Sequence, residues 1–303
     1  MKLSKIISKL RQIAPTLANI NQKFDEIKMN QGYILAAMAE NKNKKTIQDS
    51  EYKIFSQWGE DGIIQHLVNS IEIKNKTFIE FGVEDFIESN CRYLMMKDNW
   101  RGFVIDGSVK NIDRVKGQYF YWKYDLEAVA SFIDVENIND LLARSGFDYD
   151  LGILSIDIDG NDYYVLEAIK FFRPRILICE YNSLFGPSRT ITVPYDPNFR
   201  RTNAHYSNLF FGASLGALYY LAQKKGYSLV ATSSAGVNAF FVRNDLMKGN
   251  LQSLAPEEAY TSSHFRESRN KAGELTFVSG DKRFEIIRGQ KVFNVATNTE
   301  ETL

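Results

Sequence analysis

The stretch Thr77-Phe78-Ile79-Glu80-Phe81-Gly82-Val83-Glu84 decides the fold of this chain. Its first residues form an apolar run that predicts a buried strand over 77–82, and Glu80 and Gly82 stand where that strand should end. A glycine lets a ligand approach the backbone closely, and a carboxylate accepts hydrogen bonds from hydroxyl or ammonium groups. Ligands of open α/β sheets bind beyond the carboxyl ends of the strands. Glu80 and Gly82 are therefore the first candidates for a binding site.

Apolar runs that end in an acidic residue recur along the chain. Strands are predicted at 77–82, 102–106, 119–125, 151–157 and 175–180, with helices predicted at 56–70, 87–98, 134–145, 161–172 and 213–226. Near-continuous apolar strands separated by helices indicate a parallel sheet with both faces covered. Two further runs, 227–233 and 238–243, are joined too closely for a crossover helix and should pair antiparallel at the sheet edge. The predicted fold is α/β, with a doubly wound, mostly parallel seven-stranded sheet.

Three parts of the chain differ in their pattern. Residues 1–50 read as a helical, coiled-coil-like extension, and residues 51–250 as the α/β domain. Within that domain, the polar stretch 183–212 is an insertion, and polar loops of about 30 residues inside a compact domain are usually functional or disordered. Residues 251–303 contain short apolar runs at 275–278, 283–287 and 292–295, which predict a small β appendage.

The N-terminal extension carries an apolar residue at every third or fourth position. These residues are Leu3, Ile6, Leu10, Ile13, Leu17, Ile20, Phe24 and Ile27, and Ile34 and Met38 continue the series after a polar position at Gln31. Such spacing gives one apolar stripe along a helix, as in a coiled coil, although Pro15 should kink or restart the helix near Ala14. The stripe serves either self-association into a homo-oligomer or packing on its own domain. The lysines near the start leave a membrane-surface helix as a third alternative.

Composition narrows the class of protein. The 303 residues are 44% hydrophobic, with 37 basic and 37 acidic residues, and this balance argues against a nucleic-acid partner. No apolar run is long enough to span a membrane, and no signal peptide follows Met1, so a cytoplasmic location is expected. Cys91 and Cys179 fall inside predicted buried elements and are expected to be free core thiols.

The order of the acidic strand ends resembles that of class I S-adenosylmethionine-dependent methyltransferases. More narrowly, residues 52–245 resemble the FkbM-type methyltransferases, many of which modify sugars or natural products. The motifs that carry the resemblance are Ser56–Gly62 (SQWGEDG), Phe78–Gly82 (FIEFG) and Ser155–Asp162 (SIDIDGND). One position departs from the family, because Phe86 stands where a further glycine often follows, so the loop after the first strand should be shaped differently.

The resemblance implies S-adenosylmethionine as cofactor, and it implies a role for each matching residue. Glu80 would bind the methionine ammonium group, with Gly82 giving access to the backbone. Asp106 would accept hydrogen bonds from the ribose hydroxyls, with Gly107 and Ser108 along that edge. The remaining cofactor-binding candidates are Asp125 and Leu126 at the adenine, Asp157 at the methyl-donor end, and Gln57 and Glu60 over the amino-acid end.

Asp157 and Asp159 form a second candidate site with Glu180 and Asn182. Alternation along a strand directs Asp157 and Asp159 to the same side, and Glu180 and Asn182 do likewise on the neighbouring strand. Carboxylate and amide oxygens suit Mg²⁺ or Mn²⁺, and a bound ion would orient and acidify an acceptor hydroxyl. The alternative is that these side chains bind substrate or cap a helix without a metal.

The inserted stretch 183–212 supplies candidates for deprotonating and holding the acceptor. His205 is the candidate general base, with Asp159 as its rival if no metal binds. Arg189, Arg200 and Arg201 are candidates for binding an anionic acceptor such as a phosphate.

The function that these features imply is O-methylation of a sugar, a sugar nucleotide or a related polar metabolite, with or without the assistance of a divalent metal ion. One alternative is a metal-dependent glycosyltransferase that uses Asp157-x-Asp159 to bind a nucleotide-sugar diphosphate. Another is a degenerate scaffold with a methyltransferase fold, which only Phe86 favours. A nicotinamide dehydrogenase is disfavoured because no G-x-G-x-x-G follows the first strand.

Overall fold

The structure is a computed structural model that describes residues 2–249, 251–264 and 266–303, with side chains described from Ile20 onward. The strands of the main sheet are β1 (Thr77–Phe81), β2 (Arg101–Asp106), β3 (Leu126–Ala130), β4 (Ile153–Ile156), β5 (Ile176–Glu180), β7 (Tyr227–Thr232) and β8 (Asn238–Arg243). A smaller sheet contains β6 (Ile191–Thr192), β9 (Lys291–Asn294) and β10 (Thr299–Thr302).

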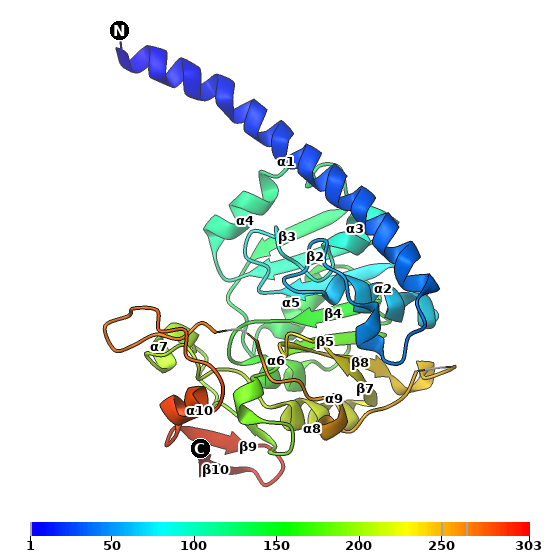
Figure 1. The fold of residues 1–303 in the computed structure, drawn as a ribbon, viewed down its shortest axis with the longest axis vertical. Coiled ribbons are helices and arrows are strands. Elements are labelled where there is room, and N and C mark those ends of the chain that lie inside the picture. Colours follow the sequence, from blue (N-terminus) through cyan, green and yellow to red (C-terminus); the bar gives the residue numbers. More distant parts are fainter. Residues whose placement is uncertain (1, 250, 265) are drawn as a thin grey trace.

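Helices surround the main sheet and precede it (Figure 1). They are α1 (Lys2–Asn41), α2 (Glu60–Ser70), α3 (Arg92–Asp98), α4 (Val109–Lys116), α5 (Ile138–Arg144), α6 (Asp162–Ala168), α7 (Arg201–Ala204), α8 (Leu215–Lys225), α9 (Pro256–Ala259) and α10 (Lys282–Ile287). Short 3₁₀ helices cover Ile47–Ser50, Ser183–Phe185 and Asn244–Leu246.

The main sheet has the strand order β3-β2-β1-β4-β5-β8-β7. Neighbouring strands are parallel, except that β8 runs antiparallel to both β5 and β7. This is the topology of the class I methyltransferase fold, and it confirms the predicted fold class. The chain moves outward from β1 to β3 and then crosses back to β4, so the strand order reverses between β1 and β4 (Figure 1). Ligands of open α/β sheets bind at such a switch point.

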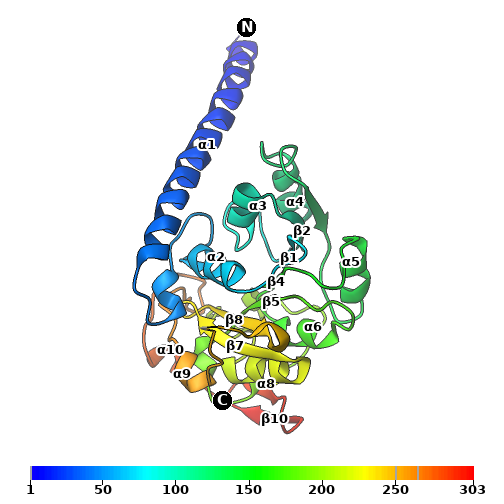
Figure 2. The same ribbon diagram turned by 90° about the vertical axis from the view of Figure 1, so that its right-hand side faces the viewer.

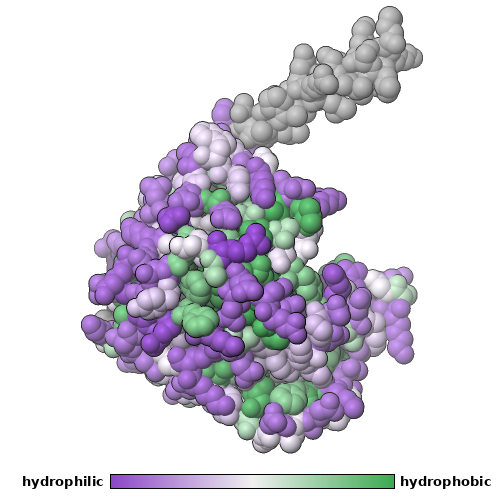
Figure 3. Space-filling model, turned by 180° about the vertical axis from the view of Figure 1, so that it is seen from behind, coloured by the Kyte–Doolittle hydropathy of each residue, from purple (hydrophilic) through white to green (hydrophobic). Residues whose placement is uncertain are grey.

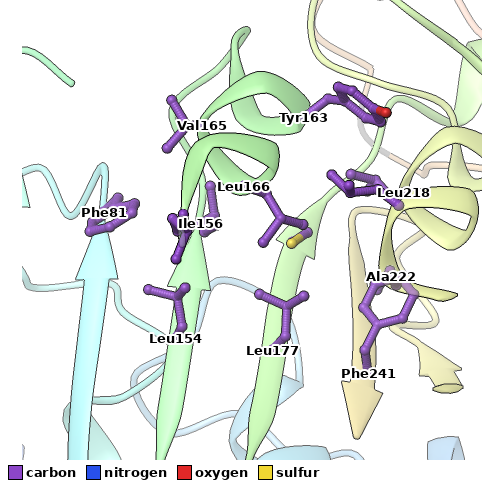
Figure 4. Packing of buried hydrophobic residues seen from close by; sticks show 14 of the residues in the cluster. Phe81, Leu154, Ile156, Tyr163, Val165, Leu166, Leu177, Leu218, Ala222 and Phe241 are labelled. Carbon is purple, nitrogen blue, oxygen red and sulfur yellow. The ribbon is translucent and has the colours of Figure 1, made fainter. Parts of the chain in front are cut away.

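Apolar side chains cover both faces of the sheet, as expected for buried parallel strands. Helices α2, α3 and α4 pack on one face, and α5, α6 and α8 pack on the other (Figure 2). On the second face, Leu154 and Leu177 of neighbouring strands meet Leu166 of α6 (Figure 4). Cys91 and Cys179 are buried free thiols, one in each of these two cores, as predicted.

Three predicted strands are wrong. Residues 119–124 form turns, and β3 begins only at Leu126, so Asp125 precedes this strand and does not end it. Aromatic residues in this run suggested a strand, but Phe120 instead packs against Phe86 in the core, with ring centroids 5.9 Å apart. In the C-terminal part, residues 283–287 belong to helix α10, and residues 275–278 form no strand.

The smaller sheet joins the inserted stretch to the end of the chain. Strand β6 pairs antiparallel with β9, where Ile191 faces Asn294, and β9 pairs antiparallel with β10. The backbone N–H of Leu303 donates to Gln290 O at 3.0 Å, which fixes the last residue. The division of the chain into 1–50, 51–250 and 251–303 stays a prediction about folding units.

Helix α1 leaves the body of the molecule and projects beyond it (Figures 1 and 2). The helix is not interrupted at Pro15, so the predicted restart near Ala14 is wrong. Within the described ranges, no helix is both long enough and apolar enough to cross a membrane.

Candidate active site

A cavity of about 780 Å³ opens beyond the carboxyl ends of the central strands. Residues at the strand ends form its sheet wall, including Glu80, Gly82, Asp106, Gly107, Asp157, Asp159, Glu180 and Asn182. The inserted stretch and the C-terminal tail form its outer wall, including Phe199, Arg201, Leu209, Phe211, Ser263, Glu267 and Arg283. Seen from behind, the surface is notched on the side where α7 lies (Figure 3).

Glu80 lies near the end of β1, in the sheet wall, and holds the loop that starts α3. Its Oε1 accepts from the backbone N–H of Asn90 at 2.8 Å, and its Oε2 accepts from Ser89 Oγ at 2.7 Å and from the N–H of Cys91 at 3.1 Å. The side chain is 5% exposed, and burial raises the pKa of its carboxyl group. Glu80 is therefore a buried acceptor at the cavity that also positions the loop beside it.

The backbone conformation and the close packing at position 82 both require a glycine. Its φ is +69°, and a Cβ at this position would lie 1.6 Å from the carbonyl oxygen of Asp157. The loop after β1 thus passes against the end of β4 at a distance that only glycine allows. Gly82 therefore sets the spacing between the ends of β1 and β4.

Phe86 takes no part in lining the cavity, although it departs from the family pattern. Its φ is +60°, a left-handed conformation that favours glycine, yet its ring is fully buried. The ring stacks on Phe78 with centroids 6.4 Å apart and an interplanar angle of 8°. The side chain turns into the core between the sheet and α3, so it leaves the cavity open.

Asp106 ends β2 and lines the cavity as predicted. Its Oδ2 accepts from the N–H of Glu84 at 2.9 Å, and its Oδ1 accepts from the N–H of Ser108 at 2.8 Å and from Asn111 Nδ2 at 3.1 Å. Gly107 lines the cavity beside it. Ser108 does not, because its hydroxyl caps α4 by accepting from the N–H of Asn111.

The predicted adenine contacts of Asp125 and Leu126 are wrong, because both residues lie at the start of β3, at the opposite end from the cavity. Asp125 is exposed and forms a surface ion pair with Arg101 Nε at 2.5 Å, whereas Leu126 is buried in the core. At the end of β3 that reaches the cavity stand Ser131 and Phe132, which the sequence prediction missed. The residues over 126–130 are apolar except for Glu127, and this short run was the signal that could have found them.

The segment before α2 supplies one cavity residue and one residue that supports it. Gln57 lines the cavity. Glu60 does not, because its Oε2 accepts from the N–H groups of Trp58 and Gly59, each at 2.9 Å. Its Oε1 accepts from Asn238 Nδ2 at 3.2 Å, and Asn238 does line the cavity. Glu60 therefore positions other residues and would not contact a cofactor directly.

Three predicted metal ligands come together in the sheet wall. Asp157, Asp159 and Glu180 each offer a carboxylate oxygen, and these oxygens lie within 4.8 Å of one another. Glu180 is 8% exposed, and its Oε2 has no hydrogen-bond partner among the described residues. We call these three residues the carboxylate cluster. A buried carboxylate oxygen without a donor suits a bound cation, so the cluster fits a hard metal ion.

Asn182, the fourth predicted metal ligand, lines the cavity and uses its amide to hold the backbone. Its Nδ2 donates to the backbone oxygens of Leu209 and Phe211, each at 3.0 Å, and its Oδ1 accepts from the N–H of Leu184 at 3.0 Å. The amide is therefore used to fasten the inserted stretch to the end of β5.

Asp162 shapes the loop that carries Asp159. Its two carboxylate oxygens accept from the N–H groups of Ile158 and Gly160 at 2.8 and 2.9 Å, and burial raises its pKa to about 6. Asp159 adopts φ +57° in this loop, a strained conformation for a residue with a side chain. Strain of this kind at a cluster of polar groups favours a functional role for Asp159.

The carboxylate cluster retains protons more readily than isolated acids. Burial raises the pKa of Asp157 well above its ordinary value, and the nearby Asp159 and Asp162 raise it further. Burial and the neighbouring Asp157 raise the pKa of Glu180 in the same direction. Like charges held together in this way favour a cation between them.

Arg201 is the predicted arginine that reaches the cavity, and it faces the carboxylate cluster. Its Nη1 lies 2.7 Å from Asp159 Oδ1, its Nε donates to Asn208 O at 2.7 Å, and its guanidinium stacks on Phe211 at 3.8 Å. Burial lowers the pKa of Arg201, but Glu180 and Asp159 outweigh burial and raise it overall. These contacts hold the outer wall against the cluster.

Arg189, Arg200 and His205 do not line the cavity, so the roles predicted for them are wrong for this geometry. Arg189 pairs with Glu301 at 2.8 Å, and Arg200 lies over the ring of Phe132 at 5.5 Å. His205 Nδ1 lies 2.7 Å from Ser207 Oγ, and burial lowers its pKa. Histidine was chosen as a base by residue type alone, and its ring is not among the groups that line the cavity.

The cavity is strongly acidic, although the whole chain has no net charge. Its acidic lining residues are Glu80, Glu84, Asp85, Glu88, Asp106, Asp157, Asp159, Glu180 and Glu267. Its basic lining residues are Arg201 and Arg283. Such an excess of carboxylates attracts cations and repels phosphates.

No protein-family model and no curated protein matches the chain. Solved structures that match include the N-terminal domain of EvdMO1 with SAH bound, with 10% identity, a TM-score of 0.38, and coverage of 62% of this chain and 80% of that one. Another is an S-adenosylmethionine-dependent methyltransferase from Clostridium acetobutylicum, with 7% identity, a TM-score of 0.40, and coverage of 61% and 90%. A third is an O-methyltransferase family protein from Burkholderia thailandensis, with 10% identity, a TM-score of 0.36, and coverage of 68% and 59%. Similarities of this size carry no information about substrate.

Proposed function

We propose that this chain is an S-adenosylmethionine-dependent O-methyltransferase of the FkbM type that acts on a sugar or a related polar metabolite. The observation that supports this proposal most is the pair of carboxylates at the ends of β1 and β2. Glu80 and Asp106 face one cavity at the switch point of a sheet with the class I methyltransferase topology. The proposal assigns the sheet wall to the cofactor and the outer wall to the acceptor.

The charges and hydrogen-bonding groups of the sheet wall suit S-adenosylmethionine. The cofactor carries an ammonium group, a sulfonium group and two ribose hydroxyls, and the sheet wall offers carboxylates at Glu80 and Asp106. Asp106 already accepts three hydrogen bonds, and an ionised carboxylate has about four acceptor positions, so it keeps capacity for a ribose hydroxyl. Phe132 and Ile133 offer apolar surface for the adenine ring.

We further propose that the carboxylate cluster holds Mg²⁺ or Mn²⁺ beside the acceptor. Asp157, Asp159 and Glu180 form an all-oxygen ligand set, and the unpartnered Oε2 of Glu180 is the atom that a cation would satisfy. When bound, the ion would lower the pKa of an acceptor hydroxyl. Arg201 would position Asp159 through their 2.7 Å contact, and Phe211 would help to exclude water.

The outer wall suits a neutral acceptor rich in hydroxyl groups. Leu209 and Phe211 offer apolar surface, and Ser263 and Glu267 offer polar groups, a combination that matches the apolar face and hydroxyl edges of a sugar ring. The excess of carboxylates disfavours a sugar nucleotide, whose phosphates would be repelled.

The alternative function is a metal-dependent glycosyltransferase. It is favoured by one observation, namely that Asp157 and Asp159 both belong to the carboxylate cluster. It gives the carboxylates of Glu80 and Asp106 no ligand to bind, although both line the cavity. The degenerate scaffold loses its only support, because the ring of Phe86 is buried in the core and does not block the cavity.

Calorimetry with S-adenosylhomocysteine tests the cofactor assignment. The chain should bind S-adenosylhomocysteine without metal, and Asp106→Asn should weaken binding at least about tenfold, since hydrogen bonds to a charged group are worth roughly 1.5–3 kcal/mol. Asp125→Asn is the matched control and should bind as the wild type does. Binding of a uridine diphosphate sugar with Mn²⁺, but not of S-adenosylhomocysteine, would select the glycosyltransferase instead.

Calorimetry with Mn²⁺ tests the metal assignment separately. Asp157→Asn and Glu180→Gln should each lose Mn²⁺ binding and keep S-adenosylhomocysteine binding, because the cofactor contacts lie mostly at β1 and β2. Glu88→Gln, a carboxylate of the same cavity outside the cluster, should keep both. If the wild type binds no Mn²⁺ or Mg²⁺ in the presence of S-adenosylhomocysteine, the metal proposal is wrong.

A further inference from the structure

Helix α1 attaches to its own domain through one face only. Asp25 of this face is 8% exposed and forms a buried ion pair with Arg92, and Met29 is 9% exposed. A Cβ at Gly32 would lie 2.8 Å from the ring of Tyr93, so the helix approaches the domain closely there. We call the face that contains Asp25, Met29 and Gly32 the docking face.

A different face of α1 carries the apolar stripe and remains exposed. The exposed residues are Ile20 (41%), Phe24 (59%), Ile27 (61%), Ile34 (62%) and Met38 (64%). At about 100° per residue, this stripe lies roughly 140° around the helix from the docking face. We call these five residues the apolar seam. The seam therefore does not serve packing on its own domain, which was one of the alternatives that the sequence left open.

We propose that the apolar seam binds the same seam of a second copy of this chain, in a parallel, two-fold symmetric coiled coil. The seam has the 3-4 spacing of a heptad repeat, whose average of 3.5 residues keeps one stripe facing a partner helix over many turns. In the sequence, Leu17, Ile13 and Leu10 continue the same spacing toward the N-terminus. A repeat of this length is not needed by a helix that packs on a globular domain.

Gln31 favours a parallel pair in register. It occupies the seam position between Ile27 and Ile34 and is exposed in the single chain. In a parallel pair with two-fold symmetry, Gln31 meets Gln31 of the second copy, and the two amides can hydrogen-bond to each other. In an antiparallel pair or a shifted register, each amide would face an apolar side chain and lose a partner.

The area of the seam is close to what a stable dimer needs. The five exposed side chains offer on the order of 500 Å² on each helix, so two copies would bury on the order of 1,000 Å². Stable interfaces bury roughly 1,200–2,000 Å² in total. The further seam positions from Leu3 to Leu17 in the sequence are sufficient to close this difference.

The charges beside the seam distinguish a second copy from other occupants. Lys23 and Lys28 flank the seam, and Lys28 Nζ lies over the Phe55 ring of its own domain, 5.4 Å from the ring centroid. These two positions offer no opposite charges to each other in a parallel pair, so the apolar seam alone drives association, and association should hold or strengthen as salt rises. An anionic membrane surface or an acidic partner would bind these lysines and would be weakened by salt.

Light scattering on the full chain tests the proposal. The wild type should have a mass twice the 34.8 kDa of one chain, at about 0.05 M and at about 0.5 M NaCl. Ile27→Asp with Ile34→Asp places two carboxylates in the seam and should give a monomer. Asn30→Asp with Ala37→Asp places two carboxylates on the same turns outside the seam and should remain a dimer. Near-ultraviolet circular dichroism, which reports the packing of core aromatic residues, should be equal in both variants and shows that the α/β domain is folded in each.

Three results would overturn the proposal. The first is a wild type that stays monomeric, including one that binds vesicles of anionic phosphatidylglycerol as a monomer. The second is a dimer that persists in Ile27→Asp with Ile34→Asp, because another surface would then hold it. The third is a dimer that dissociates as salt rises.

Discussion

Replacing Gly82 with alanine should destabilise the protein through the contact between β1 and β4. Gly82 has φ +69°, and a left-handed conformation costs a residue with a Cβ roughly 1–2 kcal/mol. The new Cβ would lie 1.6 Å from Asp157 O and 2.8 Å from its carbonyl carbon, so the backbone must move. Forced overlap of this kind costs roughly 1–3 kcal/mol more. The expected loss is therefore about 2–5 kcal/mol of the free energy of unfolding.

Urea unfolding of three variants separates these two causes. Gly146→Ala has a similar φ of +63° with no atom within 4 Å of the new Cβ, so it should show the conformational cost alone. Gly107→Ala, whose Cβ would make an ordinary 3.5 Å contact with Phe132, should be close to the wild type. Gly82→Ala should lose more than Gly146→Ala, and it should also bind Mn²⁺ more weakly because Asp157 shifts. Equal stability of Gly82→Ala and Gly146→Ala would refute the contact between the strand ends.

Three further predictions concern stability. Phe86→Ala should lose about 3–5 kcal/mol in urea unfolding, since a fully buried ring is removed, while S-adenosylhomocysteine binding survives. Burial raises the pKa of the Asp61 carboxyl group from 3.8 to about 6 in the folded protein, so the folded wild type loses stability as pH rises from about 4 to about 7. Asp61→Asn has no such proton to lose and should gain up to about 3 kcal/mol in the free energy of unfolding relative to the wild type over this range. A difference that does not vary with pH would contradict this. A chain that ends at 287 should keep the cooperative unfolding of the main sheet but lose β9 and β10, which limited proteolysis within 183–212 would detect.

The fold was predictable where burial dominates the sequence. The runs that became β1, β2, β4 and β5 are almost wholly apolar, because both faces of these strands are covered. The run 119–125 failed because aromatic residues favour strands in general, and here Phe120 instead enters the core from a turn. The strand predicted over 283–287 is helix α10 instead, because a short apolar run fits a strand or a helix equally well.

The candidate site was predictable only on its sheet wall. The topology of a parallel sheet places strand ends together, so Glu80, Asp106 and the carboxylate cluster followed from the order of the strands. The outer wall was not predictable, because Glu267 comes from an irregular segment and Arg283 from the short helix α10, and the positions of both depend on tertiary contacts. No periodicity marks such residues, and a type-based choice such as His205 had no geometric support.

The pairing of β6 with β9 has a consequence for the order in which the protein is completed during synthesis. Every strand of the main sheet has been synthesised once the chain reaches Arg243, so the sheet wall can fold early, as N-terminal units generally do. Strand β6 must wait for Lys291–Asn294, about a hundred residues later in the chain. The outer wall of the cavity is therefore completed later than its sheet wall, and a nascent chain presents the sheet wall to a ligand before the outer wall can enclose that ligand.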